Sequence, residues 1–217
     1  MTSSRDTVLA TIRAAIAGDA APPPIPRDYL RSGDHPPGSA PVVELLTDRL
    51  IDYKAIVDRV TPDELPRAVD GALAGLAGVV VAPGLDPAVV AACAGDLSAG
   101  PARNVMTDSA PTPLTPQELD SIDAVVTTAR VAIALTGTIV LDGGPGQGRR
   151  ALTLVPDRHV IILTADQIVE TVAEAIGLLT PTAPLTMIAG PSATSDIELE
   201  RVEGVHGPRT LHVIIVE

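Results

Sequence analysis

A glycine-rich loop that ends in two arginines is the clearest candidate for binding chemistry in this sequence. The segment Gly137–Arg150 reads GTIVLDGGPGQGRR, in which a β-branched run stops at an aspartate and opens into the loop. Glycines permit positive φ and carry no side chain, so backbone N–H groups can line a concavity that the arginines make electropositive. The pattern predicts an anion-binding loop with the candidate ligand-binding residues Thr138, Asp142, Gly143, Gly144, Gly146, Gly148, Arg149 and Arg150.

Each charged residue of this loop also has a structural interpretation. Asp142 either orients a substrate or stabilises the turn by accepting from a loop N–H, and the turn role is favoured. Arg149 and Arg150 can grip a carboxylate or phosphate as a fork, or one of them can pair with Asp142 or Asp157; we expect one of each. The loop matches neither the Walker A motif nor the dinucleotide fingerprint, so neither P-loop chemistry nor NAD binding is supported.

A second candidate cluster lies between Gly190 and Arg209, in GPSATSDIELERVEGVHGPR. Ser192 supplies a hydroxyl, Arg209 a positive charge, and His206 an imidazole on a loop bounded by glycines, which is typical of accessible chemistry. His206 is therefore the candidate catalytic residue, although a purely structural role for it stays open. A hydrolytic triad is not favoured, because no G-x-S-x-G nucleophile motif is present.

Composition limits the classes of function. The 217 residues include no Phe or Trp and carry a formal charge of −12, which weighs against nucleic acid as a partner. The single cysteine, Cys93, allows no internal disulfide and no cysteine-based zinc or iron–sulfur site within one chain, and no other metal site is predicted. No segment has the uninterrupted apolar length of a signal or membrane span, so we expect a soluble, cytoplasmic protein without membrane insertion.

The positioning elements follow from periodicity and capping signals. We expect an N-terminal helix and a Pro-rich arm over residues 1–40, followed by one α/β domain over residues 41–217. Helices are predicted at Ser4–Ala17 with Ser4 as N-cap, Val42–Val60, Thr61–Ala77, Pro87–Ala94, in TPQELDSI with a capping pair at Thr115 and Glu118, and at Asp166–Leu179.

Apolar strand-like runs alternate with these later helices. Ala124–Leu135 with the following GTIVLD is predicted to form one or two strands. Further strands are predicted in GVVVAPG, RNVMTD, His159–Leu163, LTMIAGP and LHVIIVE. Such alternation indicates a mostly parallel sheet with helices on both faces, in which ligands commonly bind beyond the carboxyl ends of the strands.

The two candidate segments together resemble the LUD-domain family, and within it the lactate utilization protein C group. The resemblance rests on GTIVLDGGPGQGRRALTLVPDRHVIIL and GPSATSDIELERVEGVHGPRTLHVIIVE, with IPRDY near the amino terminus. It implies a fold similar to the NagB/RpiA/CoA-transferase-like group and a part in oxidising L-lactate to pyruvate. It also implies iron–sulfur partner proteins, whose clusters would supply the redox centres that this chain does not bind alone.

One position departs from the family pattern. Relatives commonly carry a glutamate before T-G-T or S-G-T, where this chain has Leu135. Leucine cannot serve as a carboxylate nucleophile, which argues against CoA-transferase chemistry.

Three functions follow as hypotheses. The first is a cluster-free component of a lactate-oxidising system, in which the glycine loop and the segment from His206 to Arg209 form one cleft for lactate or a nucleotide phosphate. The second is a non-catalytic assembly or anion-binding module. The third and weakest is an ATP-dependent enzyme resembling a cyclo-ligase, for which fold likeness is a poor warrant.

Overall fold

The computed structural model describes residues 3–18, 24–95, 102–194, 202–203 and 207–217, and the chain divides into two compact units, Met1–Leu30 and Arg31–Glu217. The first unit contains helix α1 (Ser4–Ile16). Its N-cap is Ser3 rather than the predicted Ser4, because the Ser3 hydroxyl accepts from the Asp6 N–H and the Asp6 carboxylate accepts from the Ser3 N–H.

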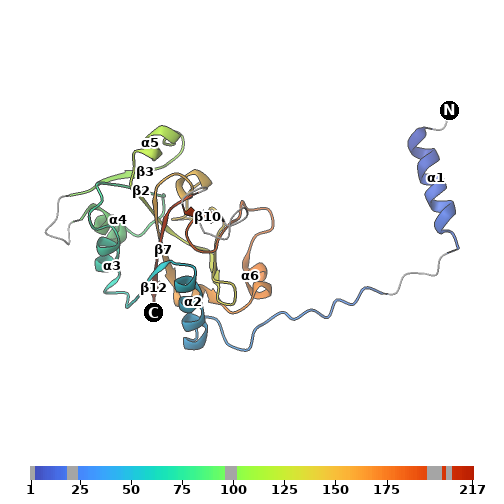
Figure 1. The fold of residues 1–217 in the computed structure, drawn as a ribbon, viewed down its shortest axis with the longest axis horizontal. Coiled ribbons are helices and arrows are strands. Elements are labelled where there is room, and N and C mark those ends of the chain that lie inside the picture. Colours follow the sequence, from blue (N-terminus) through green and yellow to red (C-terminus); the bar gives the residue numbers. More distant parts are fainter. Residues whose placement is uncertain (1–2, 19–23, 96–101, 195–201, 204–206) are drawn as a thin grey trace. The chain divides into compact units, whose positions relative to one another are not determined.

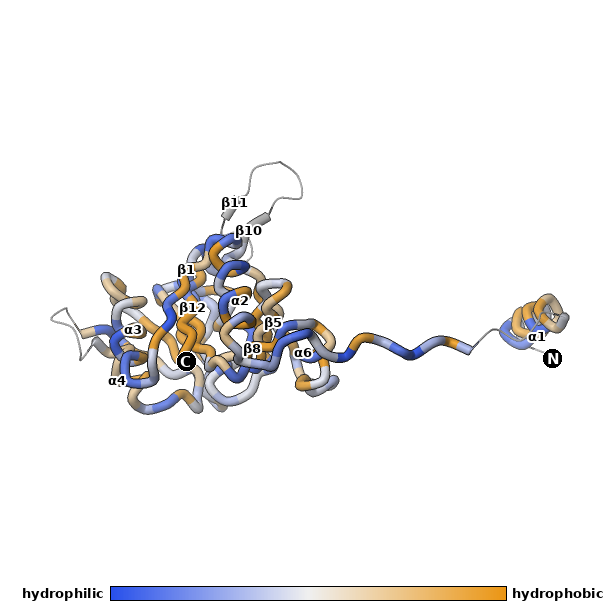
Figure 2. Tube along the Cα trace, turned by 90° about the horizontal axis from the view of Figure 1, so that it is seen from below, coloured by the Kyte–Doolittle hydropathy of each residue, from blue (hydrophilic) through white to orange (hydrophobic). Residues whose placement is uncertain are grey.

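The second unit is built on a six-stranded sheet in which every pair of neighbours is parallel (Figure 1). In spatial order the strands are β1 (Ile56–Val60), β12 (Thr210–Val216), β7 (Arg158–Thr164), β4 (Ala124–Thr128), β2 (Gly78–Val81) and β3 (Asn104–Thr107). The central strands are mostly apolar and buried, and Figure 2 shows β12 largely in the hydrophobic colour.

Helices cover both faces of this sheet. Helices α3 (Leu65–Ala72) and α4 (Pro87–Ala94) pack on one face, against alternate apolar residues of β2 and β4. Helix α2 (Ala40–Asp52) packs on the other face against β7 and β12, and α5 (Pro116–Asp120) lies beside β2 and β4 there. The predicted α/β class with a mostly parallel sheet and helices on both faces is confirmed.

A second, four-stranded sheet shares the core on the α2 side. Its order is β8 (Ile168–Val169), β5 (Val131–Ile133), β6 (Thr138–Leu141) and β9 (Thr186–Ile188). The pairs β5–β6 and β6–β9 are antiparallel. Helix α6 (Val172–Leu178) packs on the outer face of this sheet, and a short pair, β10 (Ala193–Thr194) with β11 (Val202–Glu203), completes the strands.

Three predicted helices are wrong in part. The predicted helix Thr61–Ala77 is shorter at both ends and spans only Leu65–Ala72. The predicted helix Val42–Val60 ends at Asp52, and its last five residues form the strand β1, which pairs with β12. In the predicted helix Asp166–Leu179, residues Ala165–Gln167 form a 3-10 turn and Ile168–Val169 pair with β5, so the helix begins only at Val172. Tertiary pairing overrides helical spacing in the last two places. Among the described helices, none is long and apolar enough to cross a membrane.

Candidate functional site

The glycine loop is closed on itself by the side chain of Gln147. Its Oε1 accepts from the backbone N–H groups of Asp142 at 2.6 Å and Gly143 at 3.1 Å. The Asp142 carboxylate accepts from the N–H of Gly144 at 3.1 Å. Gln147 is buried, so an amide oxygen of the chain itself fills the position expected for an anion. The turn role favoured for Asp142 is what the structure shows.

The rest of the loop packs between the carboxyl ends of β2 and β4 in the six-stranded sheet. The N–H of Gly146 donates to the Pro83 carbonyl at 2.8 Å, just beyond β2, and its carbonyl accepts from the N–H of Thr128 at the end of β4. The chain leaves β2 towards β3 and β4 towards β7, so this is the topological switch point where such sheets commonly bind ligands. Gly146 has φ +74°, and an added Cβ would lie 2.8 Å from the Thr128 hydroxyl. This glycine therefore serves close packing.

Arg149 forms a structural ion pair, but with Asp108 rather than with the predicted Asp142 or Asp157. Its Nε and Nη2 lie 2.7 and 2.9 Å from the two carboxylate oxygens, and Nη2 also donates to the Leu114 carbonyl. Asp108 is buried, and the guanidinium holds the pKa of this carboxyl below its usual value. The pair fixes the segment after β3 to the end of the glycine loop.

Two other predicted residues, and Leu135 at the family's glutamate position, lie away from a shared cleft. Thr138 begins β6, three residues and roughly 10 Å along the strand from Leu141, where the loop starts. Arg209 pairs with Asp157 at 3.4 Å on the surface, where both side chains are exposed. Leu135 lies in the turn between β5 and β6 and is half exposed.

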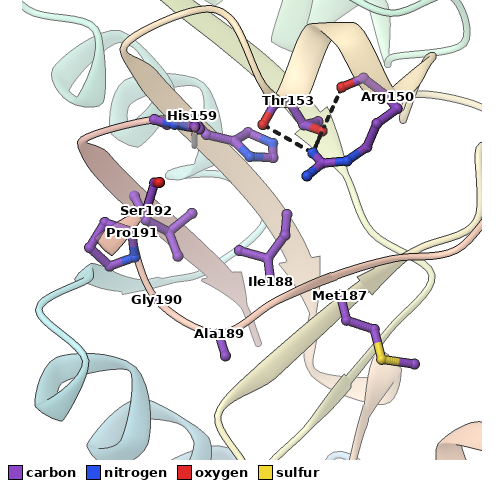
Figure 3. A pocket seen from close by; sticks show the side chains of 12 residues that line it. Arg150, Thr153, His159, Met187, Ile188, Ala189, Gly190, Pro191 and Ser192 are labelled. Carbon is purple, nitrogen blue, oxygen red and sulfur yellow. Dashed lines mark hydrogen bonds between the residues drawn. The ribbon is translucent and has the colours of Figure 1, made fainter. Parts of the chain in front are cut away.

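Arg150 lines a cavity of about 240 Å³ at the amino ends of β7 and β12 (Figure 3). Its Nη1 donates to the hydroxyl of Thr153 at 2.7 Å and to the carbonyl of the same residue at 3.3 Å. Among the described residues no carboxylate lies within 4 Å of this guanidinium. The cavity is lined by Arg150, Thr153, His159, Met187, Ile188, Ala189, Gly190, Pro191, Ser192, Gly207, Pro208 and Leu211.

His159 is the buried polar group of this cavity. It is 1% exposed, and its Nε2 lies 2.8 Å from the hydroxyl of Thr127 on the neighbouring strand. Burial, and secondarily the charge of Arg150, lower the pKa of the imidazole to about 3, so it is neutral at pH 7. The sequence places His159 in a strand without suggesting a site; the available signal was one histidine in an otherwise apolar run.

The cavity joins the ends of the two candidate segments. Ser192 lies on its wall, and the Ser192 N–H donates to the Pro208 carbonyl at 2.9 Å. Arg150, the last residue of the first segment, faces the same space. His206, the candidate catalytic residue, lies outside the described residues. Across the described part of the chain, no group of three metal-ligating side chains occurs.

Comparisons with known proteins agree on one family. The LUD domain model matches residues 112–216, which include every residue lining the cavity. Lactate utilization protein C of Deinococcus radiodurans is 43% identical over 217 residues, 96% of this chain and 93% of that protein. Lactate utilization protein C of Halalkalibacterium halodurans is 32% identical over 110 residues, covering 46% of this chain and 47% of that protein.

A solved structure extends the likeness to three dimensions. The crystal structure of a DUF162 family protein from Deinococcus radiodurans superposes with a TM-score of 0.67 at 37% identity, covering 82% of this chain and 98% of that one. Similarity in sequence along nearly the whole chain and in fold gives one conclusion: this chain belongs to the LUD-domain family.

Proposed function

We propose that this chain is the cluster-free component of an L-lactate utilization system and that it binds a small carboxylate beside Arg150. In the proposed reaction, L-lactate would lose two electrons and two protons to become pyruvate, and partner proteins that carry iron–sulfur clusters would supply the electron acceptor. The shared family with proteins named lactate utilization protein C supports the choice of pathway.

The observation that carries the ligand class is the state of Arg150. Arg149, its neighbour in sequence, is neutralised by Asp108, whereas Arg150 has no carboxylate within 4 Å among the described residues. Its fork faces a cavity that also contains an imidazole and the Ser192 side chain. A guanidinium in this setting binds a carboxylate through two parallel hydrogen bonds.

The chemistry available in this cavity supports binding rather than oxidation by this chain. A general base works best with a pKa near the operating pH, and the pKa of His159 is about 3. Cys93 lies outside the cavity, in the core beneath α3 and α4. Burial raises the pKa of its thiol to about 12, which does not favour a thiolate ligand for a metal. We therefore assign electron transfer to the partner proteins.

A second candidate is a non-catalytic assembly module, supported by apolar side chains on the outer face of α6. Val172 and Ile176 are 43% and 61% exposed, and Leu135 lies near the start of this helix, where its N–H donates to the Glu170 carbonyl. Exposed apolar side chains grouped in this way are typical of interaction surfaces. An assembly module would bind the iron–sulfur partners here and need no ligand at Arg150.

Add-back to an extract from cells lacking this chain separates the alternatives. Lactate-dependent dye reduction is measured after adding wild-type protein, Arg150→Gln, or the matched control Arg209→Gln, which removes an exposed arginine outside the cavity. We expect rescue by wild type and by the control, and at least a tenfold loss with Arg150→Gln. Equal rescue by all three would favour the assembly module, and no dependence on the chain would refute the pathway.

A further inference from the structure

The imidazole of His159 is held by one buried hydroxyl. Thr127 on β4 and His159 on β7 lie on neighbouring strands, in a register that pairs Thr127 with Ile161. Thr127 is fully buried, and its Oγ1 lies 2.8 Å from Nε2 of His159. In such a pair either group is formally able to donate, so the direction of the hydrogen bond depends on what else surrounds the hydroxyl.

The surroundings of Thr127 determine that direction. Among the described residues, Nε2 of His159 is the only acceptor within hydrogen-bond distance of its Oγ1. A fully buried hydroxyl that left its proton without an acceptor would incur a desolvation penalty. The Thr127 hydroxyl therefore donates to Nε2, and the neutral imidazole carries its proton on Nδ1.

Nδ1–H is then the free polar group of His159. Within the described part of the chain no partner is found for Nδ1, and the ring belongs to the wall of the cavity. Figure 3 shows the imidazole directed towards Arg150 and Thr153. Thr153 uses its hydroxyl proton on the Arg150 carbonyl and accepts from the guanidinium, so Arg150 and His159 both present donors to a ligand.

We propose that this cavity selects a 2-oxo carboxylate over the corresponding 2-hydroxy carboxylate. This inference rests on the proposed function and names its ligand class. A 2-oxo acid has only acceptors: its carboxylate binds Arg150, and its oxo oxygen accepts from Nδ1–H of His159. A 2-hydroxy acid offers the same oxygens but adds a proton, for which neither side chain provides an acceptor.

This selectivity has a consequence for the reaction. A subunit that binds the oxidised acid more tightly than the reduced one makes oxidation of the bound acid more favourable than oxidation of the free acid, because binding and reaction are linked. The chain would thereby favour oxidation of the acid that it holds, without itself accepting electrons.

The tautomer is tested without any ligand. Long-range ¹H–¹⁵N correlation spectra at pH 7 distinguish an Nδ1–H from an Nε2–H imidazole, and the spectrum of His159→Gln assigns the signal among the four histidines. We expect Nδ1–H for His159. An Nε2–H tautomer would overturn the inference, whatever the protein binds.

The selectivity is tested by calorimetric titration with pyruvate and with L-lactate. The hydroxyl oxygen of L-lactate can still accept from Nδ1–H, but its proton finds no acceptor on Arg150 or His159, and this unmet donor predicts a dissociation constant for pyruvate about tenfold below that for L-lactate. Thr127→Val, which removes the hydroxyl that fixes the tautomer, should reduce this ratio below about threefold. The control Thr47→Val removes a hydroxyl that bonds within α2 and should keep the ratio.

The outcomes separate this inference from the proposed function. Equal affinity of the wild type for both acids refutes the selectivity and leaves the carboxylate site intact. If neither pyruvate nor L-lactate binds, the carboxylate site itself is refuted. If Thr127→Val does not fold, the wild-type ratio and the tautomer still decide the question.

Discussion

Arg149→Gln tests whether Arg149 is structural while Arg150 binds the ligand. Arg149 makes two charge-assisted hydrogen bonds to Asp108, whose residue is 5% exposed. Glutamine cannot neutralise this carboxylate, which then stays buried without its charge partner. The change should therefore lower the stability of the protein and leave carboxylate binding unchanged.

The magnitude follows from the burial of the two partners. Removing one partner of a fully buried ion pair costs about 3–5 kcal/mol. Because the Arg149 side chain is 39% exposed, water can approach Asp108 in the variant, and we reduce the expectation to about 2–3 kcal/mol. For a protein of this size that is a fall of about 5–10 °C in melting temperature.

The assay is urea unfolding at pH 7, with Arg150→Gln as the matched control. Arg150 has no carboxylate partner among the described residues, so its variant should lose less than about 1 kcal/mol.

The pH dependence of the stability difference adds a second check. The pKa of Asp108 is lower in the folded protein than its unfolded value near 3.8. The ion pair therefore stabilises the fold fully above pH 3.8, and this stabilisation is lost as the pH falls through the lowered pKa. The gap between wild type and Arg149→Gln should therefore narrow below pH 3.8, and a constant gap, or equal loss in both variants, would refute the reasoning.

Three further changes probe other parts of the structure. Gln147→Ala removes the acceptor of two loop N–H groups and should cost about 2 kcal/mol in urea unfolding without altering pyruvate affinity; a loss of affinity would restore the loop as the binding site. His159→Gln should flatten the pH dependence of stability between about pH 3 and 6.5, because in this range the histidine is protonated in the unfolded chain but not in the native protein. The effect is at most about 5 kcal/mol, and parallel stability curves of wild type and variant would contradict it. Arg103→Gln should cost about 3–5 kcal/mol in the same unfolding assay, since the buried Arg103 pairs with Asp70 and donates to the carbonyls that end α3 and α4; a change below 1 kcal/mol would contradict that role.

Local signals predicted the elements that depend on local chemistry. Helix α4 spans Pro87–Ala94 as expected, because Asp86 caps it and a proline occupies its first turn. The capping box of Thr115 and Glu118 starts α5 as expected. The prediction of helix for the strand Ile56–Val60 is wrong, because none of its residues is fully buried at the sheet edge and its exposed and half-buried residues show no two-residue alternation.

The candidate site shows the same limit. The glycine-rich motif identified Arg149 and Arg150 together, but only the fold shows that Asp108, 41 residues upstream, neutralises Arg149. Gln147 was not considered, because a side chain that folds back onto its own loop leaves no mark in the sequence. His159 becomes noteworthy only when β7 is placed beside Thr127 and the cavity.

The most direct test of the central claim is a crystal structure of the protein grown with pyruvate. We predict the carboxylate on the guanidinium of Arg150, the oxo oxygen within about 3 Å of Nδ1 of His159, and Gln147 still bonded to its own loop. Pyruvate bound to the backbone of the glycine loop, with Gln147 displaced and the Arg150 cavity unchanged, would contradict this prediction.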